Sequence, residues 1–590
     1  MNDTKDTQLL DHLNFPEDIK DLSPEDLELL ASEIRQRLLE IGDSCGGHLA
    51  SNLGVVELTI VLHILFDSPT DKFVWDTSHQ CYVHKMLTGR LTDMFSVRRK
   101  GGLSGFANIF ESKHDSFGAG HASTALSAGI GLAHARDVMK DDNYVVSVVG
   151  DSGLSGGMCY EALNNAEKLK SNYICVVNDN DMSISPPVGV MSNYLTKIRT
   201  SPMYDQAKGM FRDFLDNVPK SGPLKRRIEK GIDHFRDVLL DNKVGVIFEE
   251  FGFKYIGPID GHDIPMLMTA LKYAKTYEGP IMIHIVTQKG KGHVPAELDP
   301  VKYHGIKPKS SGPSKKSNIS SSDLFGQTMI DICNKRDDVV VITPAMIGGS
   351  GLTAFEKAHP SKLYDVGIAE EHAVTFAAGL ARGGTKPVLA IYSTFLQRGY
   401  DQLIHDVCLQ QLPMVLALDR AGFAGEDGAT HQGVFDYNYM LPIPNITILA
   451  PKDGAEQESM LRWAVEQDLT VSVRYPKGAV IERQDIPVLA FNELKAEVML
   501  ENSKDSRYDL CLIGVGSMAW PAYDAAKQLQ QYYNLNCCVI NLRSVKPLDL
   551  DTLNQYIPQS KFVMVIEEGQ GIGAVFQHIM SQYLASDKAL

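Results

Sequence analysis

Short apolar runs recur along the whole chain, and each is followed by a stretch with the period of a helix. The runs are bounded by Gly, Asp or Asn and are apolar at successive positions, as in strands that are buried on both faces. Strands that alternate with helices indicate parallel sheets of the α/β class. The clearest predicted strands are residues 144–149, 173–177, 280–286, 338–343, 387–391, 413–418, 511–515, 537–541 and 562–566.

Two polar segments interrupt this alternation. Residues 307–323 are rich in Ser, Lys and Pro and carry no apolar period, which predicts an exposed linker. A charged stretch at 492–507 marks a second boundary. We therefore expect a first domain at 1–306, a linker at 307–323, a second domain at 324–490 and a third at 495–590. Residues 196–243 have mixed charge, with breakers in the middle, and predict a helical insertion at the surface.

The charge and the cysteines exclude several classes of protein. Of 590 residues, 57 are Lys or Arg and 73 are Asp or Glu, so the net charge of −16 disfavours nucleic acid and anionic membranes as partners. The nine cysteines form no CxxC pair, which argues against a disulfide framework or a zinc module. We expect no signal peptide, and the longest apolar stretch, residues 55–66, is too short to span a bilayer. These features predict a protein of a reducing, cytoplasmic compartment.

Polar side chains follow two of the predicted strands. Asp151 stands in GDS and Asn180 in NDND, 29 residues apart, which suits two neighbouring parallel strands joined by a helix. A carboxylate and an amide oxygen are hard ligands that suit Mg²⁺, and the glycines after Asp151 would admit a diphosphate to a helix start. Ordinary βα turns also use Asp and Asn as caps, and the spacing alone does not separate these readings.

The motifs around this pair carry a family resemblance. GDS…NDN is similar to the thiamine diphosphate fingerprint GDG…N. The other motifs are SGGHLASNLGVVELT, WDTSHQCYVHKMLTGR, GAGHASTALSAGIG, VGIAEEHAVTFAAGLA, IYSTFLQRGYDQLIHDV, DRAGFAGEDGATHQG and RYPKG. Together, and in this order, they resemble the 1-deoxy-D-xylulose-5-phosphate synthase family of transketolase-like enzymes over nearly the whole chain.

The resemblance implies a fold and a reaction. The fold is three α/β domains: a thiamine diphosphate-binding domain for the diphosphate and Mg²⁺, a pyrimidine-binding domain, and a transketolase C-terminal-like domain. The reaction is that of a transferase, which joins pyruvate to D-glyceraldehyde 3-phosphate, releases CO2 and forms 1-deoxy-D-xylulose 5-phosphate. The product feeds isoprenoid, thiamine and pyridoxal synthesis, and the enzyme is expected to be a cytoplasmic homodimer.

The same resemblance assigns cofactor ligands. Glu370 corresponds to the glutamate that hydrogen-bonds the aminopyrimidine of thiamine diphosphate. A Glu at a helix start also suits the helix dipole, Glu371 fits that reading equally, and only the family motif selects Glu370. Phe395 would stack on the pyrimidine. The metal ligands would be Asp151, Asn180 and the carbonyl of Met182, and the other cofactor contacts His79, Gly120, His121, Ala122, Ser152, Gly153, Asn180 and His293.

Catalytic and substrate residues follow by the same route. The catalytic set is Glu370, His48, His79 and His431, since imidazoles transfer protons or hold a developing alkoxide. A lone histidine is more often structural, but two histidines within Gly-rich motifs favour function. A phosphate substrate requires local cations, and guanidinium groups bind phosphate bidentately. The substrate set is Ser51, Tyr392, Arg398, Arg420, Asp427, Arg474, Lys289 and His304, although Arg474 also fits a surface ion pair.

The sequence departs from the family pattern in three places. Ser152 replaces the second Gly of GDG, which costs free energy if its φ is positive. Ser78 replaces the Gly before His79, and a tilt of that histidine or no effect are both open. The third domain is expected to be shortened by a strand and a helix, with effects on stability or on the dimer before activity. Two alternatives therefore stay open: another transketolase-like enzyme, or a cofactor-binding paralogue with little activity.

Overall fold

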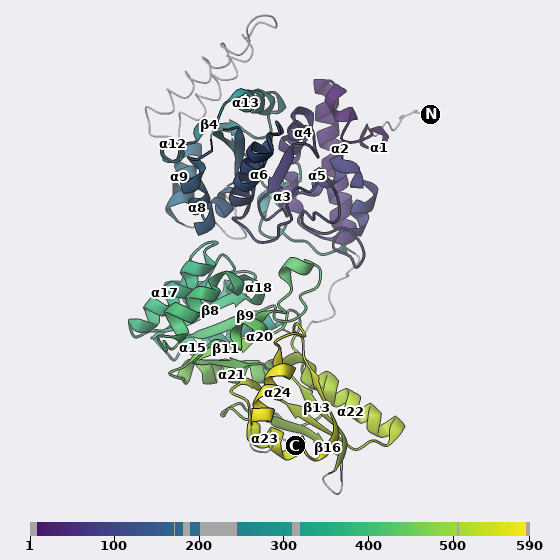
Figure 1. Ribbon diagram of the computed structural model, residues 1–590, viewed down its shortest axis with the longest axis vertical. Helices are drawn as coiled ribbons and strands as arrows, with labels where there is room; N and C mark the ends of the chain where they lie inside the picture. Colours follow the sequence, from purple (N-terminus) through teal and green to yellow (C-terminus); the bar gives the residue numbers. More distant parts are fainter. Residues whose placement is uncertain are drawn as a thin grey trace, which may run out of the picture. The chain divides into compact units, whose positions relative to one another are not determined.

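The computed structural model describes residues 9–169, 171–180, 189–200, 245–309, 319–503 and 507–585 (Figure 1). The chain divides into two compact units, Met1–Pro313 and Ser314–Leu590, and each is described by itself. Most of the predicted insertion and of the predicted linker lies outside the described residues, so both stay predictions, as do the three domain boundaries. Within the described part, no helix is long and apolar enough to cross a membrane.

Unit 1 is built on a five-stranded sheet in the order β1-β2-β3-β5-β4, with every pairing parallel. All seven residues of β3 are buried, as its continuous apolar run predicts. The strands β1 and β4 were missed, because β1 is only four residues long and a register shift between Ile256 and Ile259 breaks β4 at a Gly-Pro pair. The bounds are β1 Lys72–Trp75, β2 Val145–Gly150, β3 Tyr173–Asp179, β4 Lys254–Asp260 and β5 Pro280–Val286.

The helices of unit 1 include one that is apolar nearly all round. The helix α4 is buried from Val56 to His63 and contacts α2 and α13, as a helix inside a core does. The bounds are α1 Leu9–His12, α2 Pro24–Cys45, α3 Leu49–Leu53, α4 Val56–Leu65, α5 Tyr82–Lys85, α6 Ala125–Met139, α7 Asp151–Leu154, α8 Gly157–Ala166, α9 Val190–Arg199, α12 Val246–Glu250, α13 Ile264–Thr276 and α14 Val294–Leu298.

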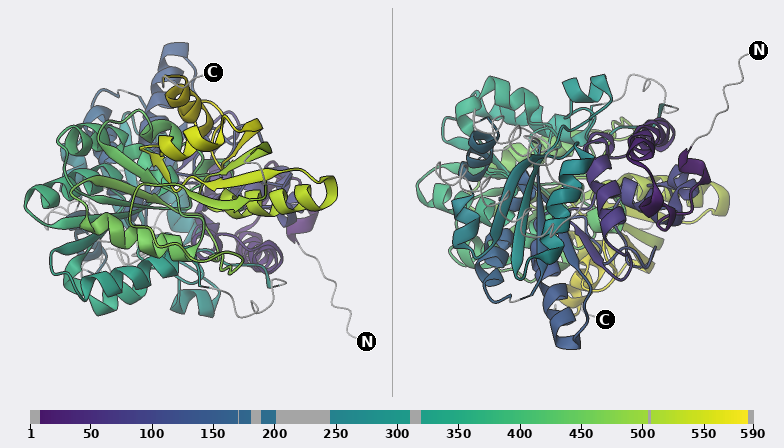
Figure 2. Two further views of the ribbon diagram at one scale, coloured as in Figure 1. Left: turned by 90° about the horizontal axis from the view of Figure 1, so that it is seen from below. Right: turned by 90° about the horizontal axis from the view of Figure 1, so that it is seen from above.

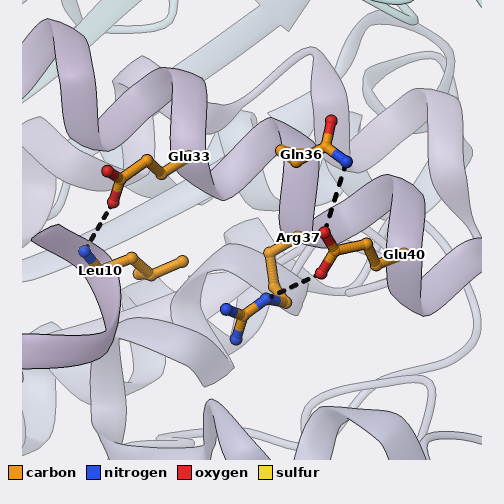
Figure 3. A pocket seen from close by; sticks show the side chains of 5 residues that line it. All are labelled: Leu10, Glu33, Gln36, Arg37 and Glu40. Carbon is orange, nitrogen blue, oxygen red and sulfur yellow. Dashed lines mark hydrogen bonds and ion pairs between the residues drawn. The ribbon is translucent and has the colours of Figure 1, made fainter. Parts of the chain in front are cut away.

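A small hollow lies where α1 meets α2 (Figure 3). The Glu33 carboxylate accepts hydrogen bonds from the backbone N–H groups of Leu9 and Leu10, at 3.0 and 2.7 Å. Arg37 pairs with Asp11 at 2.8 Å and with Glu40 at 3.2 Å. Because these groups satisfy one another, we interpret the hollow as a helix junction.

Unit 2 contains two sheets. The larger sheet has the order β15-β10-β11-β9-β8-β6-β7 and is parallel except for the pairing of β10 with β15. The smaller sheet has the order β12-β14-β13-β16, with only β12 antiparallel. The strand β15 comes from the predicted third domain, so it ties that segment into the larger sheet. The bounds are β6 Val339–Thr343, β7 Leu363–Asp365, β8 Lys386–Tyr392, β9 Val415–Asp419, β10 Ile446–Leu449, β11 Thr470–Arg474, β12 Glu497–Glu501, β13 Tyr508–Gly514, β14 Cys537–Asn541, β15 Ser544–Lys546 and β16 Ser560–Ile566.

Helices pack on both faces of the smaller sheet at its strand β13 (Figures 1 and 2). The edge strand β16 is mostly exposed, with Phe562 71% and Met564 52% exposed, so the apolar run at 562–566 forms a strand but is not buried on both faces as predicted. On β13, Leu512 belongs to the core cluster that contains Trp520 of α22, whereas Cys511 and Ile513 belong to the cluster that contains residues of α23 and α24. This alternation is the two-residue period of a strand with opposite faces buried. The mostly parallel α/β class predicted from the sequence is confirmed. The helices of unit 2 are α15 Ser321–Cys333, α16 Thr353–Ala358, α17 Glu370–Arg382, α18 Ser393–Leu396, α19 Tyr400–Gln402, α20 Asp436–Met440, α21 Gly454–Glu466, α22 Ala519–Tyr533, α23 Leu550–Tyr556 and α24 Val575–Ala585.

All nine cysteines lie within the described residues, and every one is a buried free thiol. Burial raises the pKa of the Cys81 thiol to about 12. Burial also raises the pKa of Cys333 and Cys408 to about 11. The absence of a disulfide framework agrees with the prediction from cysteine spacing.

A buried ionic network anchors the loop that follows α5 in unit 1. Arg90 pairs bidentately with Asp115 at 2.7 and 2.9 Å, and the backbone N–H of Asn108 donates to the same carboxylate at 2.9 Å. The His84 Nε2 lies 3.2 Å from Asp115. Burial raises the pKa of Asp115, but hydrogen bonds from His84 and Arg90 outweigh it and hold the pKa well below its usual range.

We expect Asp115→Asn to lower the free energy of unfolding by about 1–3 kcal/mol at pH 7, because Arg90 loses one of its two carboxylate partners and keeps only Glu111, at 2.8 Å. A depressed carboxyl pKa stabilises the fold above the unfolded pKa of about 4, and this stabilisation is lost as the pH falls further. Urea unfolding should therefore show the gap between wild type and variant narrowing below pH 4. Asp331→Asn, at an exposed pair with Arg462, is the control and should change little. Equal stability of wild type and Asp115→Asn at pH 7 would contradict the network.

Candidate active site

Asp151 and Asn180 lie at neighbouring strand ends of unit 1. The strands β2 and β3 pair in parallel with Gly150 opposite Asn178, so the residues that follow them share one edge of the sheet. The Asp151 side chain is buried, and the Asn180 Oδ1 is a buried oxygen with no hydrogen-bond partner among the described residues. A buried amide oxygen left in this way beside a carboxylate suits a hard cation such as Mg²⁺. Met182 lies outside the described residues.

The turn after Asp151 packs directly against Asp76, and only glycine fits at position 153. A Cβ at Gly153 would clash with the Asp76 carboxylate, and Ser123 Oγ donates to the Gly153 carbonyl at 2.7 Å. The Ser152 Oγ is buried and has no partner within the described ranges. Gly153 and Ser152 therefore border a close-packed, polar turn at the start of α7, as a diphosphate-binding turn requires.

Asp76 holds the next loop in place. Its carboxylate accepts hydrogen bonds from the backbone N–H groups of Ser123, Thr124 and Ala125, at 2.9, 2.9 and 3.1 Å. The predicted cofactor contacts Gly120, His121 and Ala122 lie directly before this anchored turn at the start of α6.

Three predicted histidines form one cluster in unit 1. The ring centroids are 5.5 Å apart for His48 and His79, 5.7 Å for His48 and His304, and 5.2 Å for His79 and His304. An antiparallel bridge between Gly47 and Ile306 brings the segment of His304 to that of His48. Burial lowers the pKa of His79 and His304 well below the ordinary range, and the neighbouring imidazoles and Lys289 lower both further. Both rings are therefore neutral at pH 7, as a proton acceptor must be.

Lys289 and Ser51 lie near this cluster. Burial lowers the pKa of Lys289 to about 8, and the charge of Asp151 opposes the shift. The backbone N–H of Gly290 donates to the Ala50 carbonyl at 2.9 Å, which ties the loop after β5 to α3. The Ser51 Oγ is buried with no partner in the described part of the chain. His293 faces Tyr303, with centroids 5.5 Å apart.

Glu370 begins α17 in unit 2. It is buried, whereas the adjacent Glu371 is partly exposed, so the structure distinguishes two residues that the sequence alone did not. Burial raises the pKa of Glu370, and the opposing charge of Arg398, whose Nη1 lies 3.4 Å away, reduces the shift. A carboxyl group with a raised pKa at a buried helix start can hold a proton and share it with a ligand nitrogen.

Two aromatic residues of unit 2, Tyr392 and Phe395, form a stack. They lie close in sequence to Arg398, which pairs with Glu370. Phe395 stacks on Tyr392 with centroids 5.4 Å apart and an angle of 14°. The Arg420 guanidinium lies over the Tyr392 ring, with its Cζ 3.8 Å from the ring centroid. His431 meets Phe395 edge-on at 5.5 Å. The predicted set of Tyr392, Phe395, Arg420 and His431 is thus brought together by the ends of β8 and β9.

The loop that carries Asp427 and His431 is held by one side chain. Gln432 accepts from the Ala424 N–H at 2.6 Å and donates to the Gly428 carbonyl at 2.9 Å. Thr430 Oγ1 lies 2.9 Å from His431 Nδ1. Asp427 lies within this loop, between the groups that Gln432 binds, and is partly buried.

Three family models match successive parts of the chain. The model of 1-deoxy-D-xylulose-5-phosphate synthase matches residues 10–287, that of the transketolase pyrimidine binding domain 317–482, and that of the transketolase C-terminal domain 501–587. The 1-deoxy-D-xylulose-5-phosphate synthase of Pelotomaculum thermopropionicum is 46% identical over 582 residues, which cover 97% of this chain and 90% of the relative. This chain belongs to the 1-deoxy-D-xylulose-5-phosphate synthase family. The synthase of Desulforudis audaxviator is 45% identical with the same two coverages, and that of Caldanaerobacter subterraneus subsp. tengcongensis is 45% identical, covering 98% of this chain and 92% of the relative.

Membership of the 1-deoxy-D-xylulose-5-phosphate synthase family confirms the resemblance that the motifs indicated. The two serines that depart from its glycine pattern behave differently. Ser152 lies inside α7 and outside the positive-φ region, so the expected backbone cost does not arise. Ser78 has a φ of 63°, where glycine is preferred, and its Oγ accepts a hydrogen bond from the Ala107 N–H at 2.9 Å.

A pair of variants separates the effect of the positive φ at Ser78 from the effect of its hydrogen bond with Ala107. Ser78→Ala keeps the positive φ and orphans the Ala107 N–H, so we expect a loss of about 1–2 kcal/mol of unfolding free energy. Ser78→Gly loses the same bond but relieves the backbone, and its loss should be smaller by about 1 kcal/mol. Thermal and urea unfolding of both variants measure the difference. An Ala variant as stable as wild type would show that the hydrogen bond is unimportant.

Arg474 is more deeply engaged than the family role for it suggests. Its guanidinium is buried, pairs with Asp436 at 2.7 Å, and donates to the Tyr437 hydroxyl at 2.9 Å and to the Glu568 carbonyl at 2.7 Å. Glu568 follows β16, so Arg474 links the smaller sheet to the end of β11. A role in phosphate binding stays a prediction.

Two polar residues that the sequence analysis missed prove central to the geometry of the site. Asp76 follows β1 directly, at the same sheet edge as Asp151, and this position after a strand was the available signal. Asn52 is fully buried beside the histidine cluster. Its position in a Gly-rich motif was a weaker signal in the sequence.

Proposed function

We propose that this chain is an active 1-deoxy-D-xylulose-5-phosphate synthase. It joins pyruvate to D-glyceraldehyde 3-phosphate with loss of CO2, and it uses thiamine diphosphate and Mg²⁺. The observation that carries the proposal beyond family membership is the buried, unpartnered Asn180 oxygen beside Asp151 at adjacent strand ends. We also propose a cytoplasmic homodimer that takes small-molecule substrates and binds neither nucleic acid nor membrane.

Unit 1 supplies the groups for the charged end of the cofactor. Asp151 and Asn180 hold Mg²⁺, with the Met182 carbonyl as a further ligand. Ser152 and Gly153 line the diphosphate, and the close packing of Gly153 on Asp76 fixes the turn that carries them. The loop of Gly120, His121 and Ala122 and the side chain of His293 complete this set.

Unit 2 supplies the groups for the pyrimidine. When bound, thiamine diphosphate supplies a carbanion at C2 of its thiazolium ring. The raised pKa of Glu370 lets its carboxyl hold a proton toward the pyrimidine nitrogen. Phe395 presents an aromatic face for stacking.

The remaining residues handle protons and substrate. His48 and His79 take up or deliver a proton at the pyruvate oxygen, and burial keeps His79 in its neutral form. His431 serves the aldehyde oxygen of the acceptor, and Asp427 binds a hydroxyl. Arg420 and Arg474 serve as the phosphate clamp, and Tyr392, Ser51 and Arg398 are the further phosphate contacts. Lys289 and His304 contact the substrate from the segment 289–304.

The proposal is tested by product formation from pyruvate and D-glyceraldehyde 3-phosphate, with and without thiamine diphosphate and Mg²⁺. Cofactor-dependent 1-deoxy-D-xylulose 5-phosphate with stoichiometric CO2 is the expected result. Ketol transfer from a ketose donor without CO2 would point to a transketolase instead. Folded, cofactor-bound protein that makes no product would overturn the proposal in favour of an inactive paralogue.

A further inference from the structure

We infer that Asn52 is a positioning residue that fixes His48 and His79 relative to each other. The inference deepens the proposed function and rests on it, because these histidines are its proton-transfer groups. Asn52 itself does not need to touch a substrate.

The side-chain amide of Asn52 bridges the two histidine segments. Its Nδ2 donates to the His48 carbonyl at 2.6 Å and to the His79 carbonyl at 2.8 Å. Its Oδ1 accepts from the Tyr82 N–H at 2.8 Å. Both donors of the amide are therefore used on the backbones of the two predicted catalytic residues. Asn52 is 0% exposed, so water does not compete for these bonds.

The backbones that Asn52 holds require support from outside. His48 precedes α3 in an extended conformation, and His79 follows two residues, Thr77 and Ser78, with positive φ. The positive φ at Thr77 and Ser78 persists only when surrounding contacts determine it. The amide supplies one contact that acts on both segments at once, and the two imidazole centroids lie 5.5 Å apart as a result.

No other neutral side chain of similar size satisfies this arrangement. An aspartate has the same shape but presents a carboxylate oxygen to two carbonyl oxygens, which repel it. An alanine leaves both carbonyls unsatisfied in a dry interior. Either change releases the His48 and His79 segments from each other, and a misplacement of about 1 Å at a reacting group costs roughly a hundredfold in rate.

The experiment compares Asn52→Asp and Asn52→Ala with Thr59→Val. Thr59 is equally buried, and its hydroxyl bonds only the Val55 carbonyl at 2.7 Å, so its loss imposes a similar structural penalty away from both histidines. We expect the Asn52 variants to lose roughly a hundredfold in kcat, while the KM for pyruvate and the affinity for thiamine diphosphate change less than about threefold. Thr59→Val should keep kcat within about twofold of wild type.

A spectroscopic measurement reports position without turnover. In protein labelled at histidine Cε1, the NMR signals of His48 and His79, assigned from their Gln variants, should shift in the Asn52 variants and stay in place in Thr59→Val. This arm is informative even if wild type makes no product, so failure of the proposed function is distinguished from failure of the inference. Unmoved histidine signals and a wild-type kcat in a folded Asn52 variant would overturn it.

A measurement on wild type covers the case in which the Asn52 variants do not fold. With selective ¹⁵N-asparagine labelling, the Nδ2 protons of Asn52 should exchange with solvent at least about a hundredfold more slowly than those of exposed asparagines such as Asn164, because both Asn52 protons are hydrogen-bonded and buried. Exchange as fast as in an exposed asparagine would refute the bridge.

Discussion

Glu370→Gln is expected to lower kcat by at least about 10³-fold while the protein still binds thiamine diphosphate and Mg²⁺. Glutamine keeps the size of the side chain and the contact near Arg398, but it cannot hold an ionisable proton. Burial raises the pKa of Glu370, which favours the protonated carboxyl that a proton-sharing group requires. Steady-state turnover measures the loss of kcat, and calorimetric titration measures the retained binding of thiamine diphosphate.

Glu371→Gln is the matched control for Glu370→Gln. The two glutamates are adjacent at the start of α17, but Glu371 is partly exposed, so its replacement should leave kcat nearly unchanged. Equal losses in both variants would indicate a general effect on the helix start. Near-normal turnover of Glu370→Gln would refute the assigned role.

Arg420→Ala is expected to raise the KM for D-glyceraldehyde 3-phosphate roughly a hundredfold, with little change in the KM for pyruvate. The guanidinium is held by Asp419 at 2.8 Å and by the Gly349 carbonyl at 2.9 Å, and it stacks on Tyr392. This rigid support orients the planar fork for a phosphate. Arg420→Lys should rescue little, because an ammonium neither stacks nor binds bidentately.

The acceptor without its phosphate provides the sharper comparison. With D-glyceraldehyde, wild type and Arg420→Ala should have nearly the same kcat/KM, since the group that Arg420 binds is missing. Arg382→Ala, at an exposed position at the end of α17, is the control for charge removal and should match wild type with both acceptors. Parallel losses for pyruvate and for both acceptors would contradict a phosphate-binding role.

The fold and part of the site could be predicted because they depend on local patterns. Continuous apolar runs identified β2 and β3, and the spacing of 29 residues correctly made these strands neighbours. The strands β4 and β15 show the limit of this reasoning. A Gly-Pro pair interrupts β4, and β15 is three residues long and joins a sheet built mainly from an earlier segment of the chain.

The residues of the candidate site also differ in how well the sequence predicts them. Asp151 and Asn180 follow predicted strands, so position alone made them candidates, whereas the choice of Glu370 over Glu371 required either the family motif or burial. Asp76 and Asn52 act through hydrogen bonds to backbone groups, most of them far away in the sequence, and no periodicity predicts such bonds. The partners of Arg474 come from α20 and from the residues after β16, and no local pattern in the sequence predicts these contacts.

The burial of every cysteine has a practical consequence for experiments on this chain. Maleimides react with accessible thiolates, so buried thiols react slowly in the native protein. A cysteine introduced at Lys140 in unit 1 and another at Tyr532 in unit 2, both exposed positions, should therefore be labelled selectively in the native protein. Fluorophores or spin labels at these two positions would follow the distance between the units during turnover, with all nine native cysteines left in place.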